Sequence, residues 1–169
     1  NTIDNITKQS GGYENYTPTI STNLEIGVTY PFTVSRSTSA NKALRVVYID
    51  WNEDGDFNDS METVRTETAG RALSWSDSLT VPAFAKLGAT VMRVAITQGS
   101  QASDPCANTF GEYEDYRIYI TSDETPPVIT LIGADTIRVE QGNTFTDPGA
   151  TAKDNLSGNL TSRIKVTNQ

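Results

Sequence analysis

The fold is decided by a dense β-forming stretch, Leu44-Arg45-Val46-Val47-Tyr48-Ile49-Asp50-Trp51. Its β-branched and aromatic side chains predict a central strand of a sheet. Segments of similar character lie on both sides, separated by turn residues, and most of them alternate with period two: 24–34, 75–81, 90–97 and 114–121. The best helical candidate, residues 83–87, amounts to one turn at most. We therefore expect an all-β fold, an antiparallel β-sandwich of jelly-roll or Ig-like type.

The composition excludes several functional classes. The 169 residues include 13 Lys and Arg against 21 Asp and Glu, and this net charge of −8 argues against nucleic-acid binding, which needs a basic surface. The absence of His removes Ser-His-Asp and Cys-His catalysis and His-based zinc sites. The one cysteine, Cys106, cannot form an intrachain disulfide. No apolar run is long enough to predict a membrane span.

An acidic loop follows the central strand, with oxygen-bearing side chains at every second position: Asp50, Asn52, Asp54 and Asp56. Gly55 lies where a sharp turn is needed. Calcium prefers about six to eight oxygen ligands, so this pattern predicts a bound Ca²⁺. The pattern matches the first half of an EF-hand loop, but Met61 occupies the twelfth position and Glu62 comes one residue late. We expect a calcium loop at a sheet edge and not an EF-hand, because the flanking chain has strand character.

The alternative interpretation of this loop is an exposed turn without a metal, because Asp and Asn side chains readily bond to nearby backbone groups. Five acidic residues within ten favour a cation, since they would otherwise repel one another: Asp50, Glu53, Asp54, Asp56 and Asp59.

A second acidic motif, Gly111-Glu112-Tyr113-Glu114-Asp115-Tyr116, begins the strand that ends near residue 121. One interpretation is that Glu112 or Asp115 completes the calcium shell or holds a second ion. The other is a polar strand start, where charges protect a sheet edge from pairing with another chain. The sequence spacing leaves both interpretations open.

The two acidic motifs, together with segments 80–83, 88–94 and 105–106, resemble the GEVED domain family over about residues 10–121. The family is named for the second motif, in which Tyr113 replaces the Val of the name. The resemblance implies a β-sandwich appendage of a large secreted bacterial protein, often a peptidase, an adhesin or a polysaccharide-degrading enzyme. It therefore implies an extracellular location, and it does not fix a ligand.

Residues 125–167 resemble the start of a bacterial immunoglobulin-like repeat, on the basis of segments 126–131 and 145–154. Short strands are expected at 128–132, 136–140 and 163–167. We expect a GEVED-like sandwich over residues 1–122, a Pro-containing linker over 123–127 and a partial Ig-like domain over 128–169. The later strands of such a repeat are missing and the chain begins without Met, so we expect a piece of a longer, processed protein.

We expect no enzyme activity, because the pair Glu112 and Glu114 lies within the second acidic motif and no complete catalytic constellation is present. The expected function is a secreted, calcium-binding accessory module that binds a neutral or anionic polysaccharide and contacts neighbouring domains of its parent protein. It would bind no nucleic acid and insert into no membrane. The candidate ligand-binding residues are Tyr13, Trp75, Arg117 and Tyr119.

Two further functions remain open, because Trp and Tyr in a thin sandwich commonly pack in the core. One is a calcium-rigidified spacer or adhesion module with no small ligand. The other is a matrix-protein-binding appendage of a secreted peptidase.

Overall fold

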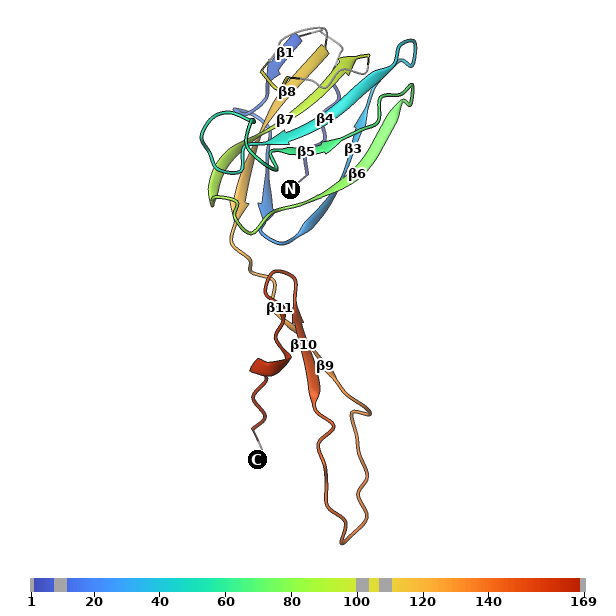
Figure 1. Ribbon diagram of the computed structural model, residues 1–169, viewed down its shortest axis with the longest axis vertical. Coiled ribbons are helices and arrows are strands. Elements are labelled where there is room, and N and C mark those ends of the chain that lie inside the picture. The colour runs from blue at the N-terminus through green and yellow to red at the C-terminus, as the bar shows by residue number, and fades with distance from the viewer. Residues whose placement is uncertain (1, 8–11, 100–103, 107–110, 168–169) are drawn as a thin grey trace. The chain divides into compact units, whose positions relative to one another are not determined.

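The chain forms two compact units, residues 1–122 and 123–169 (Figure 1). The computed structural model describes residues 2–7, 12–99, 104–106 and 111–167. Its elements are strands, apart from one short 3₁₀ helix, η1 (Thr161–Arg163). The predicted all-β fold class is therefore confirmed. Among the described residues, no helix has the length and apolar character needed to cross a bilayer.

The larger sheet of unit 1 has the strand order β1-β8-β7-β4-β5, and β2 also pairs with β8. The pairs β4–β5, β4–β7 and β7–β8 are antiparallel, as expected, whereas β1 and β2 run parallel to β8. Side chains alternate in the same way in parallel and antiparallel strands, so the sequence did not reveal these two parallel pairs. The six strands are β1 (Gly12–Asn15), β2 (Ser21–Glu25), β4 (Ala43–Ile49), β5 (Thr63–Thr66), β7 (Gly88–Gln98) and β8 (Gly111–Thr121).

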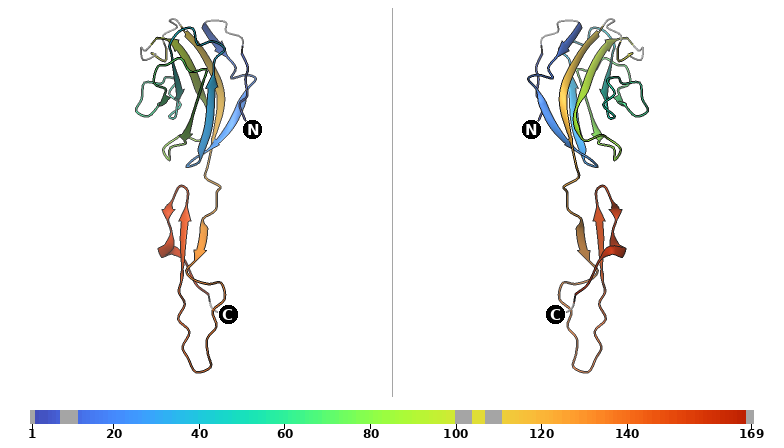
Figure 2. Two further views of the ribbon diagram at one scale, coloured as in Figure 1. Left: turned by 90° about the vertical axis from the view of Figure 1, so that its right-hand side faces the viewer. Right: turned by 90° about the vertical axis from the view of Figure 1, so that its left-hand side faces the viewer.

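A smaller sheet consists of the antiparallel pair β3 (Thr29–Ser35) and β6 (Ser74–Thr80). The expected strand region 24–34 is thus divided between the two sheets. Gly27 makes this possible, because its φ of 82° is a left-handed conformation that costs glycine little. Figure 2 shows the strands of unit 1 from two opposite sides.

The main hydrophobic core lies between the two sheets. Val47 and Ile49 of β4 and Ile118 and Ile120 of β8 belong to it, and Phe32 and Trp75 of the smaller sheet pack against it. The rings of Phe32 and Trp75 meet edge to face, with centroids 5.1 Å apart. Apolar side chains from both layers therefore face one interior, as in a β-sandwich.

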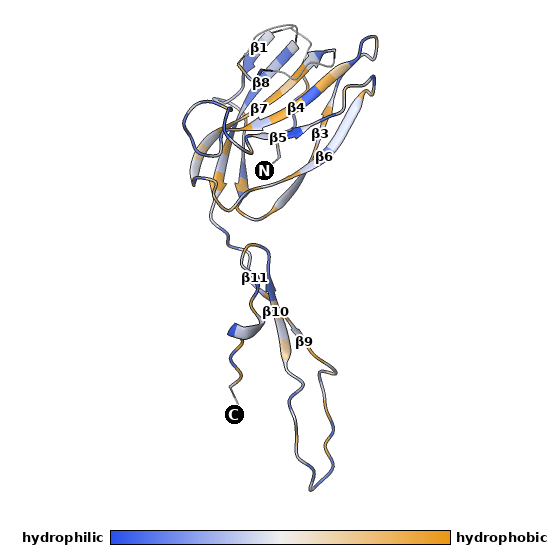
Figure 3. Ribbon diagram, viewed as in Figure 1, coloured by the Kyte–Doolittle hydropathy of each residue, from blue (hydrophilic) through white to orange (hydrophobic). Residues whose placement is uncertain are grey.

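A second apolar cluster covers the opposite face of β4. Leu44, Val46 and Tyr48 pack there with Phe57, which comes from the acidic loop. All seven residues of β4 are consequently buried, which explains why this strand is so densely apolar. Figure 3 shows hydrophobic colouring along β4 and hydrophilic colouring in the loop that follows it.

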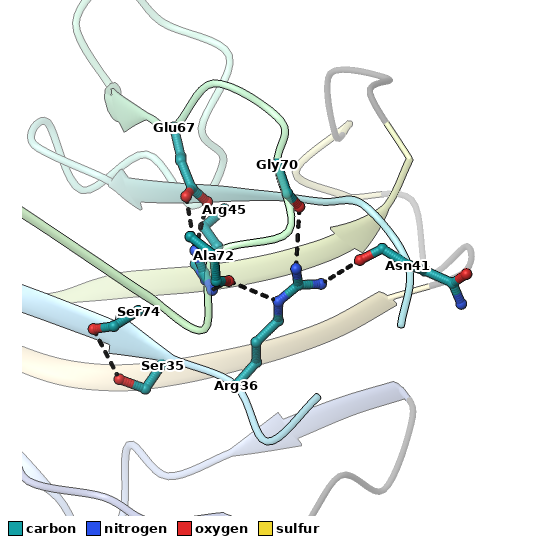
Figure 4. Close-up of polar contacts among 8 residues, drawn as sticks. All are labelled: Ser35, Arg36, Asn41, Arg45, Glu67, Gly70, Ala72 and Ser74. Carbon is teal, nitrogen blue, oxygen red and sulfur yellow. Dashed lines mark hydrogen bonds and ion pairs between the residues drawn. The ribbon is translucent and has the colours of Figure 1, made fainter. Parts of the chain in front are cut away.

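Arg36, which follows β3, and Arg45 of β4 both bind the segment between β5 and β6 (Figure 4). Arg45 is 1% exposed and donates from Nη1 to both carboxylate oxygens of Glu67, at 2.8 and 2.7 Å. Arg36 donates to the carbonyl oxygens of Gly70, Ala72 and Asn41 at 3.1, 3.0 and 2.8 Å. These charge-assisted bonds connect the segment between β5 and β6 to β4 through Arg45 and to the end of β3 through Arg36.

Unit 2 contains β9 (Val128–Leu131), β10 (Ala150–Asp154), β11 (Gly158–Asn159) and η1. These strands form an antiparallel sheet in the order β11-β10-β9. The expected strands at 136–140 and 163–167 are wrong, since neither segment is a strand and η1 occupies part of the second. Among the described residues, neither of these two segments pairs with a strand, so each lacks the support that a short strand needs.

Candidate functional site

The acidic loop begins at Asp50, which follows the last residue of β4 and is 6% exposed. Its Oδ1 accepts the backbone N–H of Asp54 at 3.2 Å, and its Oδ2 accepts that of Gly55 at 3.1 Å. The carbonyl of Asp50 accepts a hydrogen bond from the Thr90 hydroxyl. Asp50 therefore anchors the loop to β7 and organises its first turn.

The next oxygen-bearing side chains each bind the backbone N–H two residues further along. Asn52 Oδ1 accepts from Asp54 at 3.0 Å, Asp54 Oδ1 from Asp56 at 3.2 Å, and Asp56 Oδ1 from Asn58 at 2.8 Å. This series of Asx turns is the arrangement that the metal-free interpretation anticipates. It also curls the loop, so that successive carboxylates approach one another.

Glu62 lies at the end of the loop, and its side chain is buried beneath the loop with 1% exposure. Its Oε1 accepts the N–H of Trp51 at 3.0 Å, and its Oε2 accepts that of Asp59 at 3.3 Å. Burial raises the pKa of Glu62 above its ordinary value, and the nearby Asp50 adds to the rise. A carboxylate in such a place gains from any cation that reaches it.

Three carboxylates converge in the loop, those of Asp54, Asp56 and Glu62. Each offers one oxygen, and these oxygens lie within 4.8 Å of one another. Carboxylate oxygens at this separation suit a hard cation such as Ca²⁺. Asn52 lies beside the group, since its Nδ2 donates to Asp54 Oδ2 at 3.0 Å.

Sequence reasoning missed Glu62, because the EF-hand register placed it one position too late. The structure accommodates the extra residue at Met61, whose φ of 75° is left-handed. That turn lets the chain bring Glu62 back beneath the loop. The available signal was that Glu62 is an acidic residue at the end of an acidic loop. Comparison with the EF-hand pattern, which expects the acidic residue at position 61, obscured this signal.

Trp51 lies under the loop and is 2% exposed. Its indole Nε1 donates to the carbonyl of Met61 at 3.2 Å, and its own carbonyl accepts from the N–H of Lys86 at 2.8 Å. The indole of Trp51 therefore connects the start of the loop to its end at Met61.

Asp115, predicted as a metal ligand, binds Arg93 instead. Its two carboxylate oxygens accept from Arg93 Nε at 2.6 Å and Nη2 at 2.7 Å, and the Tyr13 hydroxyl donates to Oδ2 at 2.8 Å. The Arg93 guanidinium also lies over the rings of Tyr13 and Phe57. The positive charge of Arg93 satisfies Asp115 locally, and the structure does not bring Asp115 into the loop group.

Glu112, the other predicted ligand from this motif, lies on the opposite face of β8. Residues 112 and 115 differ by an odd number, so their side chains point to opposite sides of the strand. Glu112 and Glu114 line a cavity of about 1150 Å³ within unit 1. The second acidic motif is therefore divided between two environments, and neither contributes to the group formed by Asp54, Asp56 and Glu62.

The predicted ligand-binding residues are also divided. Arg117 and Tyr119 alternate along β8 with the core residues Ile118 and Ile120, so they point away from the main core. Tyr119 is 44% exposed. Tyr13, which contacts Asp115 and Arg93, lies on this same outer face and is 47% exposed.

Trp75 packs against the main core and lies apart from that face. The structure therefore places Tyr13, Arg117 and Tyr119 on one face of the larger sheet, with Tyr13 beside Tyr113 and the other two further along β8, and separates Trp75 from them.

Family comparisons agree with this architecture. Residues 44–119 match the family model of the GEVED domain, and residues 129–169 match that of the bacterial surface protein, Ig-like domain. The resemblance to both families is confirmed, in the predicted order. Neither match is to a catalytic family, and the second indicates an extracellular or surface location. No curated protein matches the chain.

Proposed function

We propose that this chain, which combines a GEVED domain with a bacterial surface Ig-like domain, is a non-catalytic accessory module that binds calcium at the acidic loop. The convergence of Asp54, Asp56 and Glu62 supports this proposal more than any other observation. These side chains would hold the ion, with Asn52 supplying a further oxygen after rotation of its amide. Bound calcium would offset the repulsion between the carboxylates and stiffen the loop.

Burial of Glu62 favours a cation over the metal-free turn. Its two backbone hydrogen bonds explain its position but leave its negative charge beside Asp50 and near Asp54 and Asp56. A divalent ion would bind all of these charges in one place.

A thermal melt tests the calcium proposal. At about a hundred times the dissociation constant, a ligand adds about 2.7 kcal/mol to the free energy of unfolding, or roughly 10 °C for a domain of this size. We expect such a rise with calcium chloride relative to EDTA. An equal midpoint in the two solutions would overturn the proposal. Magnesium at the same ionic strength is the control for general screening of charge.

We further propose that the outer face of the larger sheet binds a polysaccharide through Arg117 and Tyr119. A half-exposed aromatic ring beside a guanidinium suits the faces and the hydroxyl or sulfate groups of sugars. Tyr13 belongs to the same face, although its hydroxyl and ring are already engaged by Asp115 and Arg93.

Affinity electrophoresis against neutral and anionic polysaccharides tests the sugar proposal. We expect retardation by at least one glycan, and loss of that retardation in Tyr119→Ala with an unchanged melting temperature. Trp75→Ala is the comparison variant, which should lower the melting temperature because Trp75 packs against the core. Mobility unaffected by every glycan would leave the calcium-rigidified spacer or adhesion module as the function.

A matrix-protein-binding appendage of a secreted peptidase is the remaining candidate. Pull-down with collagen and fibronectin tests it. Retention of either protein would favour the matrix-binding function, whereas the sugar-binding function predicts that neither is retained.

A further inference from the structure

The cavity that contains Glu112 and Glu114 lies within unit 1 and is separate from the acidic loop. Its volume of about 1150 Å³ exceeds that of a typical small-ligand pocket. The inward-facing residues of β7, Met92, Val94 and Ile96, form part of its apolar wall. Such a space between two sheets exposes apolar surface that an occupant would cover.

The backbone edge of β3 forms another wall of this cavity. Every residue from Tyr30 to Ser35 lines it, although alternate side chains of a strand point to opposite faces. Consecutive residues can share one wall only where the strand presents its edge. Within the described residues, β3 pairs with β6 alone, so this edge has no strand beside it.

The hydrogen-bond pattern shows which backbone groups occupy that edge. Val81 N–H donates to Val28 O at 3.1 Å and Arg36 N–H donates to Leu73 O at 2.8 Å, at the two ends of the β3–β6 ladder. Antiparallel pairs alternate between bonded and non-bonded positions. The residues that turn their backbone groups away from β6 are therefore Thr29, Pro31, Thr33 and Ser35. Pro31 agrees with this assignment, because proline has no N–H and is tolerated at an open edge.

The charged groups at the cavity are mainly acidic. Glu114 is the central one, because its Oε1 is buried without a hydrogen-bond partner among the described residues, while Oε2 accepts from the Tyr116 hydroxyl at 2.6 Å. Asp4 and Glu112 add negative charge, and Lys42 lies at the exposed side. Arg36 also lines the cavity, but its donors are engaged by the three carbonyls described above. A donor with positive charge would satisfy Glu114.

We propose that this cavity binds an extended peptide segment, which adds as a strand to the open edge of β3 and places a lysine or arginine side chain beside Glu114. The row of alternating donors and acceptors at Thr33 and Ser35 matches a polypeptide backbone. Apolar side chains of the peptide enter the space lined by Met92, Val94 and Ile96. This proposal does not depend on calcium or polysaccharide binding.

Fluorescence anisotropy with three labelled peptides tests this proposal. The first is acetyl-Val-Thr-Lys-Thr-Val-Thr-Val-amide, in which Lys and three Val share one face of a strand. The second has Glu in place of Lys, and the third has alternate backbone nitrogens methylated to block strand pairing. We expect saturable binding of the first, with the other two at least about tenfold weaker. No binding of the first peptide at about 1 mM, or equal binding of all three, overturns the proposal.

Three variants of the intact chain locate the site. Glu114→Gln should reduce the preference for the Lys peptide about tenfold, whereas Asp77→Asn, an exposed carboxylate outside the cavity, should not change it. Pro31→Thr restores an N–H at the open edge and should tighten binding ~5-fold, the value of one net hydrogen bond. Unchanged binding in both Glu114→Gln and Pro31→Thr contradicts the site. If Glu114→Gln does not fold, Pro31→Thr and the methylated peptide still decide the question.

A second copy of the chain is the competing occupant of the edge. Sedimentation at increasing protein concentration tests this occupant. Self-association that the Lys peptide cannot displace would overturn peptide binding at β3. Repeating the anisotropy in calcium and in EDTA separates this site from the loop, because equal affinities are expected in both.

Discussion

Glu62 has a side chain that is almost fully buried but must be ionised to bind a metal. Burial raises its pKa above the ordinary 4.5, so without a metal the folded chain takes up a proton at Glu62 more readily than the unfolded chain does. Its contribution to the free energy of unfolding is then largest below 4.5 and decreases as the pH rises through the raised pKa. Calcium has the opposite effect, because it binds the ionised carboxylate and displaces the proton.

The stabilisation by calcium should therefore depend on pH. We expect the difference in melting temperature between calcium and EDTA to be full near pH 7.5 and to disappear as the pH falls through the raised pKa of Glu62. Melts in both solutions from about pH 7.5 to about pH 4.5 measure this difference. In Glu62→Gln the difference should be small at every pH. A wild-type difference that does not change with pH would exclude Glu62 as a ligand.

Arg93 and Asp115 form a partly buried pair, with side-chain exposures of 16% and 8%. Replacing Arg93 with Met keeps most of the apolar stem but leaves Asp115 with only the Tyr13 hydroxyl of its present side-chain partners. We expect Arg93→Met to lower the free energy of unfolding by about 2–3 kcal/mol in urea denaturation. The matched variant Arg117→Met, on the same face of the sheet but without an ion pair among the described residues, should change it by less than about 0.5 kcal/mol. Equal changes in the free energy of unfolding in the two variants would mean that the Arg93–Asp115 ion pair does not stabilise the fold.

The sequence located the converging carboxylates of the loop, but it did not reveal the partner of Asp115. The spacing of Asp54 and Asp56 indicated a cation, and the structure brings them together with Glu62. The pairing of Asp115 with Arg93 depends on two neighbouring strands, and one sequence does not reveal which strands are neighbours. Side-chain alternation along a strand already places Glu112 and Asp115 on opposite faces, so the two could not complete the same calcium shell.

Among the elements, β7 and β8 approach each other closely at Gly111. A Cβ added there would lie 2.6 Å from the carbonyl oxygen of Ile96, closer than real Cβ atoms come to backbone atoms. We expect Gly111→Ala to lower the free energy of unfolding by about 1–3 kcal/mol, because the two strands must move apart.

Gly70→Ala is the control for this prediction. Its added Cβ would meet only the carbonyl oxygen of Thr68 at 3.6 Å and the Ala72 nitrogen at 4.0 Å. It should leave the free energy of unfolding within about 0.5 kcal/mol of wild type or raise it slightly. Urea denaturation of both variants measures the difference, and a harmless Gly111→Ala would mean that β7 and β8 are not so tightly paired.

The strands that could be located from the sequence are those whose own residues determine that they form a strand. β4 and β7 could be located because both have long runs of β-forming residues, and the second apolar cluster explains why β4 lacks alternation. The region 24–34 was harder, since its division at Gly27 depends on the chain passing from one sheet to the other. The parallel pairing of β1 and β2 with β8 also depends on the whole topology.

For the whole molecule, the two units differ greatly in burial. Unit 1 contains both apolar clusters, whereas in the described part of unit 2 only Ala152 and Asp154 are buried. All four residues of β9 are exposed. A small unit with little buried apolar surface has little free energy to resist local opening.

Amide hydrogen exchange should therefore divide the chain at the boundary between the units. We expect amides of β4, β7 and β8 to exchange at least roughly a hundredfold more slowly than those of β9 and β10. Mass spectrometry of peptic fragments measures both sets in one sample. Equal protection of β4 and β9 would contradict this picture of unit 2.

The calcium proposal depends most on whether the loop holds an ion at all, and isothermal titration of calcium chloride into the EDTA-treated, dialysed chain measures this directly. We expect one saturable site with a dissociation constant of about 1 mM or below, as in extracellular calcium modules. We expect no such site in the double variant Asp54→Asn, Glu62→Gln, whose melting temperature in EDTA should equal or exceed that of wild type. The absence of saturable heat in the wild-type chain, or equal binding by the double variant, would contradict calcium binding at this loop.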